Sequence, residues 1–387
     1  MNKSVKIGAL LMCALPLASC SDSNDAPYNP DGQDVKEAML KSAAEAYVDN
    51  TVLPTYAGMA DHAIELADLC AEMQEKHSAG TLTTADIQAA GEAWKASRKC
   101  WELSEAFLFG PAANHNIDPH IDSWPLDKAS MDDLLANIRA GRKWSLTNNG
   151  GYGLIGFHAI EYMLYELTDG GNTSVAHPVD YAPEELTYLV AVAEDLRDQC
   201  VLLEACWAGT DNVSALKQQI LEDAELDYGE DYGWEMKHAR EAGSRYKTFQ
   251  DVAEEILVGC QDIADEVGNT KIGRPHMAAT QDDTDYIESP YSLNSIEDFA
   301  DNIISIRNAY TGSIVGDASV SDYVRSVDAD LDARVRRGIE DAITAIRAIP
   351  EPFTKTATGA EAAKAMQVCG SDLVDLIGEA RIAVTRN

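Results

Sequence analysis

Apolar residues recur at helical spacing along almost the whole of this 387-residue chain, whereas strand-like alternation is scarce. The periodicity predicts main helical segments at residues 35–76, 84–107, 153–167, 183–207, 233–267, 295–310, 321–349 and 358–386. An acidic tract rich in Gly and Tyr, residues 209–234, separates the first four segments from the last four. We therefore expect an all-α protein of two helical-bundle domains with about four main helices each, at residues 35–210 and 211–387.

Two connections are longer than the loops that usually join helices. The first covers residues 110–151 and contains Asp122 and Trp124, and the second covers residues 268–294 and contains Ser289. Long loops in helical proteins are often functional. The first one leads directly into residues 153–167, so its carboxylates are expected to fold over that segment.

Residues 153–167 form an apolar segment that contains an imidazole and a carboxylate three residues apart, His158 and Glu161. A helix here would be hydrophobic all round and therefore buried, and a buried carboxylate must be paired, hydrogen-bonded or bound to a metal. Gly156 costs about 1 kcal/mol against Ala inside a helix, which indicates that another backbone or a ligand approaches closely. Taken alone, His158 and Glu161 are equally compatible with a buried polar pair whose members hydrogen-bond each other or a neighbouring helix.

The preceding helix supports a shared polar site. One face of it carries Trp94, Arg98, Trp101, Glu105 and Leu108. Its two tryptophans mark this face as buried, so Arg98 and Glu105 need partners, whereas Glu102 is expected to be solvated. We expect Arg98 and Glu105 to point into a common pocket with His158 and Glu161.

The N-terminus predicts export and lipid anchoring. Residues 1–20 combine a basic start, a short apolar run and a Leu-Ala-Ser-Cys ending at Cys20, which is typical of a bacterial lipoprotein signal. Residues 21–34 are polar and predict a flexible tether. We expect an outer-membrane lipoprotein that is attached through Cys20 and faces either the periplasm or the cell surface.

The chain is strongly acidic, with 65 Asp and Glu against 30 Lys and Arg and a formal charge of −35. Proteins neutralise nucleic-acid phosphates with Lys and Arg, so a nucleic-acid partner is not expected. The same field would raise the local concentration of cations.

Several short motifs, in order along the chain, resemble those of the imelysin-like family. The family's Gly-x-His-x-x-Glu signature is matched by Gly156, His158 and Glu161. The other matches are Asn50-x-x-x-Pro54-x-Tyr56, Trp94-x-x-x-Arg98, Glu105-x-Phe107-x-Phe109-Gly110-Pro111, Ser123-Trp124-Pro125, the Glu288-Ser289 region and Tyr310-x-Gly312. The resemblance covers nearly all of the chain after the signal. It implies two helical bundles with a site between or near them, and an association with bacterial iron uptake.

A metal site is the leading functional hypothesis. Imidazole and carboxylates suit divalent transition metals, and hard oxygen ligands favour iron, with zinc as the alternative. We assign His158, Glu161 and Glu105 as metal ligands. The ligand-binding or site-supporting residues are Gly156, Arg98, Trp94, Asp122, Trp124 and Ser289.

Three functions remain open at this stage. The first is binding of a metal ion or chelate in iron uptake, together with outer-membrane uptake components. The second is the metallopeptidase activity with which the family has been labelled, for which a third zinc ligand would come from Glu105, Asp118, Asp122 or Asp127. This helix lacks the second His and the Glu base of the zincin motif, so we favour binding over catalysis. The third is a helical module that binds another outer-membrane protein without metal.

Overall fold

The computed structural model describes residues 30–146 and 151–386. Within these residues the protein is all-α apart from one short hairpin, as predicted. The predicted signal peptide, Cys20 and most of the predicted tether lie outside them. The first helix, α1, begins at Pro30, within the stretch predicted as a tether. In the described part of the chain, no helix is both long and apolar enough to cross a membrane.

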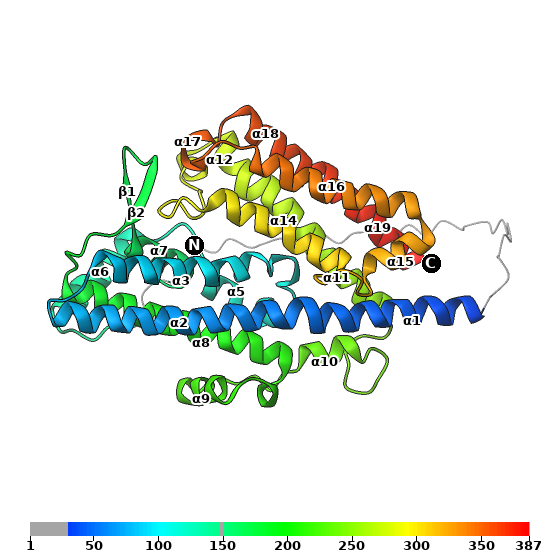
Figure 1. The fold of residues 1–387 in the computed structure, drawn as a ribbon, viewed down its shortest axis with the longest axis horizontal. Coiled ribbons are helices and arrows are strands. Elements are labelled where there is room, and N and C mark those ends of the chain that lie inside the picture. The colour runs from blue at the N-terminus through cyan, green and yellow to red at the C-terminus, as the bar shows by residue number, and fades with distance from the viewer. Residues whose placement is uncertain (1–29, 147–150, 387) are drawn as a thin grey trace, which may run out of the picture.

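The first helical group consists of α2, α3, α7 and α8 (Figure 1). The helix α2 packs against α3 and α8, and α7 packs against the same two helices. The main helices are α1 (Pro30–Ala46), which continues through the π-helical η1 (Tyr47–Val52) into α2 (Leu53–Ser78), then α3 (Thr84–Glu102), α7 (Gly156–Leu164) and α8 (Pro183–Ala208). The short elements between them are η2 (Glu105–Phe107), α4 (Pro111–Asn114), α5 (Ile117–Ile121), α6 (Lys128–Arg139) and η3 (Tyr152–Leu154).

The second helical group consists of α11, α14, α16 and α19. The helix α11 packs against α14 and α19, and α16 packs against the same two helices. Its elements are α11 (Phe249–Asp265), the π-helical η5 (Glu266–Ile272), α12 (Gly273–Met277), α13 (Gln281–Thr284), α14 (Ser295–Thr311), α15 (Val320–Val327), α16 (Ala329–Arg347), α17 (Phe353–Thr356), α18 (Ala360–Gln367), the π-helical η6 (Val368–Leu373) and α19 (Val374–Arg386). The two groups are linked by η4 (Thr210–Asn212), α9 (Ala215–Ala224) and α10 (Tyr232–Lys237).

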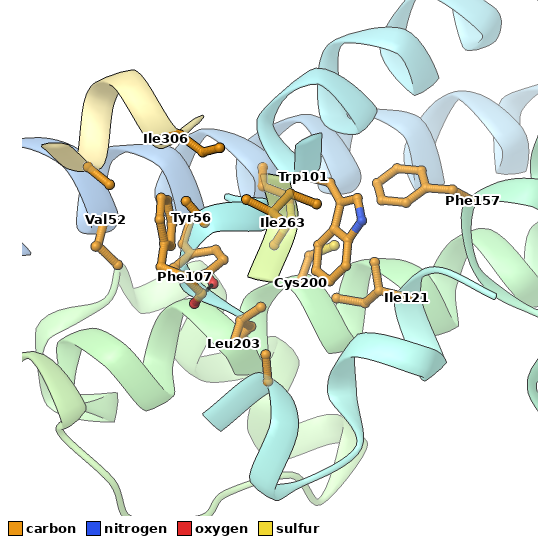
Figure 2. Packing of buried hydrophobic residues seen from close by; sticks show 14 of the residues in the cluster. Val52, Tyr56, Trp101, Phe107, Ile121, Phe157, Cys200, Leu203, Ile263 and Ile306 are labelled. Atoms are coloured by element: carbon orange, nitrogen blue, oxygen red, sulfur yellow. Dashed lines mark hydrogen bonds between the residues drawn. The ribbon is translucent and has the colours of Figure 1, made fainter. Parts of the chain in front are cut away.

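One contiguous hydrophobic core joins the two groups. Figure 2 shows Tyr56 and Phe107 of the first group beside Ile263 and Ile306 of the second. The rings of Tyr56 and Phe107 meet edge to face, with centroids 5.4 Å apart. The helix α1 leads into α2 of the first group but packs against α11 and α15 of the second. The domain boundary at residues 210 and 211 stays a prediction.

Local capping signals mark the starts of helices, including one that divides a predicted segment. The helix α3 begins at a capping box in which Thr83 and Asp86 bond reciprocally. The predicted helix 321–349 is broken at Asp328, whose carboxylate accepts hydrogen bonds from the N–H groups of Asp330 and Leu331 and starts α16. The predicted segment 233–267 is likewise divided between α10 and α11.

A hairpin replaces the end of the predicted helix 153–167. The strands β1 (Tyr165–Thr168) and β2 (Thr173–Ala176) pair antiparallel, with Tyr165 opposite Ala176. The loop between the strands is residues 169–172, in which Asp169, Gly170 and Gly171 have positive φ of 48°, 67° and 83°. The helix α7 ends at Leu164, because Tyr165 is already in the extended conformation of β1.

Candidate metal centre

Arg98 lies at the centre of a fully buried acidic site. It projects from α3 with 0 % of its side chain exposed. Its guanidinium contacts Asp122 Oδ1 at 2.5 Å, Glu102 Oε1 at 2.6 Å and Asp298 Oδ2 at 3.5 Å, and it also contacts Glu288. The prediction that Arg98 needs buried partners is confirmed.

Asp122, from the first long connection, links α3 to α7. Its Oδ1 lies 3.0 Å from His158 Nε2, and its Oδ2 accepts a hydrogen bond of 2.9 Å from Trp101 Nε1. Burial opposes ionisation of Asp122, but the nearby charges of Arg98 and His158 outweigh it and lower the pKa of this carboxyl well below its usual range. Asp122 is therefore an ionised carboxylate.

His158 and Glu161 contact each other on α7, with 3.2 Å between His158 Nδ1 and Glu161 Oε2. Glu161 Oε1 accepts hydrogen bonds from the backbone N–H groups of Tyr291 and Ser292, at 3.0 and 2.7 Å, and from Ser292 Oγ at 2.7 Å. These bonds connect α7 to the second long connection. They account for the burial of Glu161, whose side chain is 0 % exposed.

The environment of His158 favours its protonated form. Burial and the charge of Arg98 lower the pKa of His158, but the charge of Asp122 and the hydrogen bonds to Asp122 and Glu161 raise it further, to about 9. A metal would therefore compete with a proton for this imidazole.

Lys271 is a second buried cation in the site. Its Nζ lies 3.3 Å from Glu105 Oε1, 3.2 Å from Glu288 Oε1 and 3.8 Å from Glu102 Oε2. Burial raises the pKa values of Glu102 and Glu105 well above the usual range, although Lys271 lowers both and Arg98 lowers that of Glu102. These carboxyls are therefore difficult to ionise without further positive charge.

The predicted supporting residues make close contacts or hydrogen bonds with the backbone and side chains around the site. Gly156 has φ +76°, and a Cβ there would lie 2.2 Å from the carbonyl oxygen of Ile121, so the predicted close approach is made by backbone. Trp94 Nε1 donates to Phe157 O at 2.9 Å, and Ser289 Oγ donates to Asp298 Oδ2 at 2.5 Å. The centroid of the Trp124 ring lies 6.0 Å from that of His158 and 5.3 Å from Lys271 Nζ.

The predicted ligand set is only partly brought together. His158 and Glu161 are in contact, but Glu105 lies in η2 beyond the end of α3 and contacts Lys271. The change in direction after Glu102 removes Glu105 from the helical face that the sequence predicted. Asp127 is also unsuited to bind a metal together with His158, because its carboxylate caps the start of α6.

Asp122, His158 and Glu288 form the set of described residues that best suits a metal with a nitrogen ligand. One ligand atom from each lies within 4.8 Å of the others, and all three residues are buried. Glu288 Oε2 is buried without a hydrogen-bond partner, and His158 Nε2 lies 3.0 Å from Asp122 Oδ1. Imidazole and two carboxylates are a common donor set for iron and zinc. The residues therefore fit a divalent metal.

Sequence reasoning missed four important members of this site. Glu102 was expected to be solvated, but it is fully buried and bonds Arg98; its spacing of four from Arg98 was an available signal. Lys271, Glu288 and Asp298 come from the second helical group. The family match at Glu288-Ser289 was an available signal for Glu288, whereas the spacing of Lys271 and Asp298 gave none.

Comparison with known proteins agrees with the helical architecture and the motif. The family model for imelysin, a peptidase family, matches residues 52–379. This match spans most of the chain and includes every acidic, basic and imidazole group described above. The protein belongs to the imelysin family.

Individual relatives include proteins named for regulation by iron. The chain is 28 % identical over 312 residues to iron-regulated protein A of Synechococcus elongatus, covering 80 % of this chain and 76 % of that protein. A solved structure assigned as an iron-regulated protein A precursor from Parabacteroides distasonis is 26 % identical, with a TM-score of 0.75 and coverage of 94 % and 98 %. An imelysin-like protein from Psychrobacter arcticum, at 15 % identity and a TM-score of 0.57 over 90 % and 93 %, shares the fold.

Proposed function

We propose that this protein binds a divalent metal ion at Asp122, His158 and Glu288, and that it serves iron uptake at the cell envelope. The observation that carries the proposal is a buried group of three ligands in which Glu288 Oε2 has no hydrogen-bond partner. Buried polar atoms normally have hydrogen-bond partners. A metal ion would satisfy Glu288 Oε2.

The charge of the site also supports a bound cation. Six carboxyl groups, those of Glu102, Glu105, Asp122, Glu161, Glu288 and Asp298, are between 0 and 7 % exposed. The nearby cations are Arg98, Lys271 and the protonated His158, and His158 must release its proton to bind a metal. A divalent cation that replaces this proton would add positive charge among the buried acids and favour their ionised forms. The relatives' names point to iron as that cation.

Burial favours a bare ion over a chelate or a peptide substrate. The three proposed ligands are only 1 to 5 % exposed, whereas a chelate or a scissile peptide bond would have to reach them. A catalytic metal also keeps a position open to substrate. We therefore propose binding, and we take peptidase activity as an alternative that would require the site to open.

The proposal predicts that metal stabilises the protein. Adding Fe(II) without oxygen, or Zn(II), to chelator-stripped protein should raise its melting temperature, because a ligand that binds only the native state stabilises it by mass action. Asp122→Asn, His158→Ala and Glu288→Gln should each abolish this rise. Elemental analysis of protein from its own host, purified without chelator, identifies the metal.

Asp332→Asn is the matched control. Asp332 is a buried carboxylate that accepts hydrogen bonds from Tyr310 and Ser321, away from the proposed ligands. This variant should melt earlier than wild type but keep the full response to metal. A wild-type protein whose melting does not respond to Fe(II), Zn(II) or Mn(II) would contradict the proposal and favour a module that binds another outer-membrane protein.

We also propose that Cys20 carries a lipid that anchors the protein at the outer membrane, where it acts with uptake components. The support is the signal-like sequence of residues 1–20. Cys20→Ser should move the protein from the membrane fraction to the soluble fraction after cell lysis, with Cys70→Ser as the control that stays in the membrane. Unchanged membrane association of Cys20→Ser would refute the lipid anchor.

A further inference from the structure

Lys271 occupies a cation position inside the acidic site. It lies in the π-helical η5, between α11 and α12, and π-helical stretches often occur at functional sites. Its ammonium group is completely buried and contacts the carboxylates of Glu102, Glu105 and Glu288 at 3.8, 3.3 and 3.2 Å. In its absence, these three carboxylates would lose a shared counter-charge.

Glu288 connects this ammonium group to the proposed metal ligands. Its Oε1 contacts both Lys271 and Arg98, while its Oε2 has no hydrogen-bond partner. A metal held by Glu288 would therefore share that carboxylate with Lys271. Like charges that approach so closely repel strongly in a buried site, where solvent screens them little.

We propose that Lys271 is a positioning residue that sets the metal affinity of the site. It balances the carboxylates before the metal binds, and its charge then opposes the incoming divalent cation. An ammonium group has no lone pair, so Lys271 is not itself a ligand. This inference rests on the proposed function and adds a regulating residue to the same site.

Lys271→Met tests the inference, because it removes the charge and retains an unbranched side chain. The dissociation constants of Zn(II) and of Fe(II) under anaerobic conditions are measured by titration of the full chain. Lys271→Met should bind at least roughly tenfold more tightly than wild type, since one unit charge at close range in an effective dielectric of about 20 exceeds the energy of a tenfold change. Lys271→Arg retains the charge and should stay near the wild-type affinity.

Lys217→Met is the matched control for loss of a buried lysine. Lys217 lies on α9, is 4 % exposed, and contacts Asp61 and Glu204 at 2.6 and 2.7 Å. Its replacement should lower the melting temperature and leave the metal affinity unchanged. Lys271→Gln provides a second variant without charge should Lys271→Met fail to fold.

The outcomes separate this inference from the proposed function. Tighter binding in the charge-removing variants Lys271→Met and Lys271→Gln, with unchanged affinity in Lys271→Arg and Lys217→Met, supports it. Wild-type binding that is unchanged or weakened in both charge-removing variants, with the fold retained by circular dichroism, overturns the role of Lys271 and leaves the metal site in place. Absence of metal binding in wild type and in both variants overturns the metal site itself.

Discussion

At the scale of single residues, Asp122 organises the site because it bonds three side chains at once. It contacts Arg98 and Trp101 from α3 and His158 from α7. Removing one partner from such a buried ionic group is strongly destabilising, typically by about 3–5 kcal/mol, because the remaining charges stay buried. The same network determines the protonation state of His158.

The raised pKa of His158 predicts how the stability of the metal-free protein depends on pH. An imidazole titrates near pH 6.5 in an unfolded chain and near 9 in this site. The folded state therefore binds the proton more tightly. The stability that His158 contributes is fully present below about pH 6.5 and is lost as the pH rises through about 9.

Urea unfolding at pH 6.5 and pH 9.5 measures this effect, with His158→Asn as the variant that cannot be protonated. The difference in unfolding free energy between wild type and variant should shrink by up to roughly 3 kcal/mol at the higher pH. A constant difference, or an imidazole that titrates near 6.5 by NMR in the folded protein, would refute the prediction.

At the scale of elements, the position of α7 depends on close contact between two backbones. Gly156 begins α7, and a Cβ at this position would lie 2.2 Å from the carbonyl oxygen of Ile121, the last residue of α5. Asp122 follows immediately, so this contact brings its carboxylate to His158. The loop after α13 then fixes the other side of α7 through the N–H groups of Tyr291 and Ser292.

Gly156→Ala should destabilise the protein by more than the cost of placing alanine at a positive φ, because the new methyl group would also clash with a backbone oxygen. The new Cβ would lie 2.2 Å from Ile121 O, at a φ of +76°. Gly80→Ala is the matched control, because Gly80 has φ +69° and open space around it. Denaturant unfolding should give a loss of about 1–2 kcal/mol for the control and at least about 2 kcal/mol more for Gly156→Ala. Equal losses would contradict the packing argument.

At the scale of the whole molecule, the site joins the two helical groups. Arg98, Asp122 and His158 precede residue 210, whereas Lys271, Glu288 and Asp298 follow it. The hydrophobic core is also continuous between the groups, as Figure 2 shows. A metal at the proposed ligands would therefore stabilise both groups together.

Hydrogen exchange tests this coupling. Adding Zn(II) should slow amide exchange in α7 and also in residues 286–292, because His158 and Glu288 would be held by one ion and Glu161 bonds the same loop. His158→Ala should show no slowing in either segment. Slowing that is confined to α7 would show that Glu288 does not take part.

The helical class and part of the site follow from the amino-acid sequence alone. Helical periodicity is a local property, so it predicted most main helices, although it missed the break at Asp328 and the hairpin after Leu164. The burial of His158 and Glu161 followed from their wholly apolar surroundings, and the need of Arg98 for partners followed from the face it shares with tryptophans.

Long-range packing, in contrast, selects the carboxylates that meet His158. The end of α3 after Glu102 turns Glu105 towards Lys271, and the contact of Gly156 with Ile121 delivers Asp122 instead. Glu288 and Lys271 arrive from the other helical group, more than 100 residues along the chain. Their approach depends on how two sets of helices share one core, and this long-range packing is not encoded in any short spacing of residues.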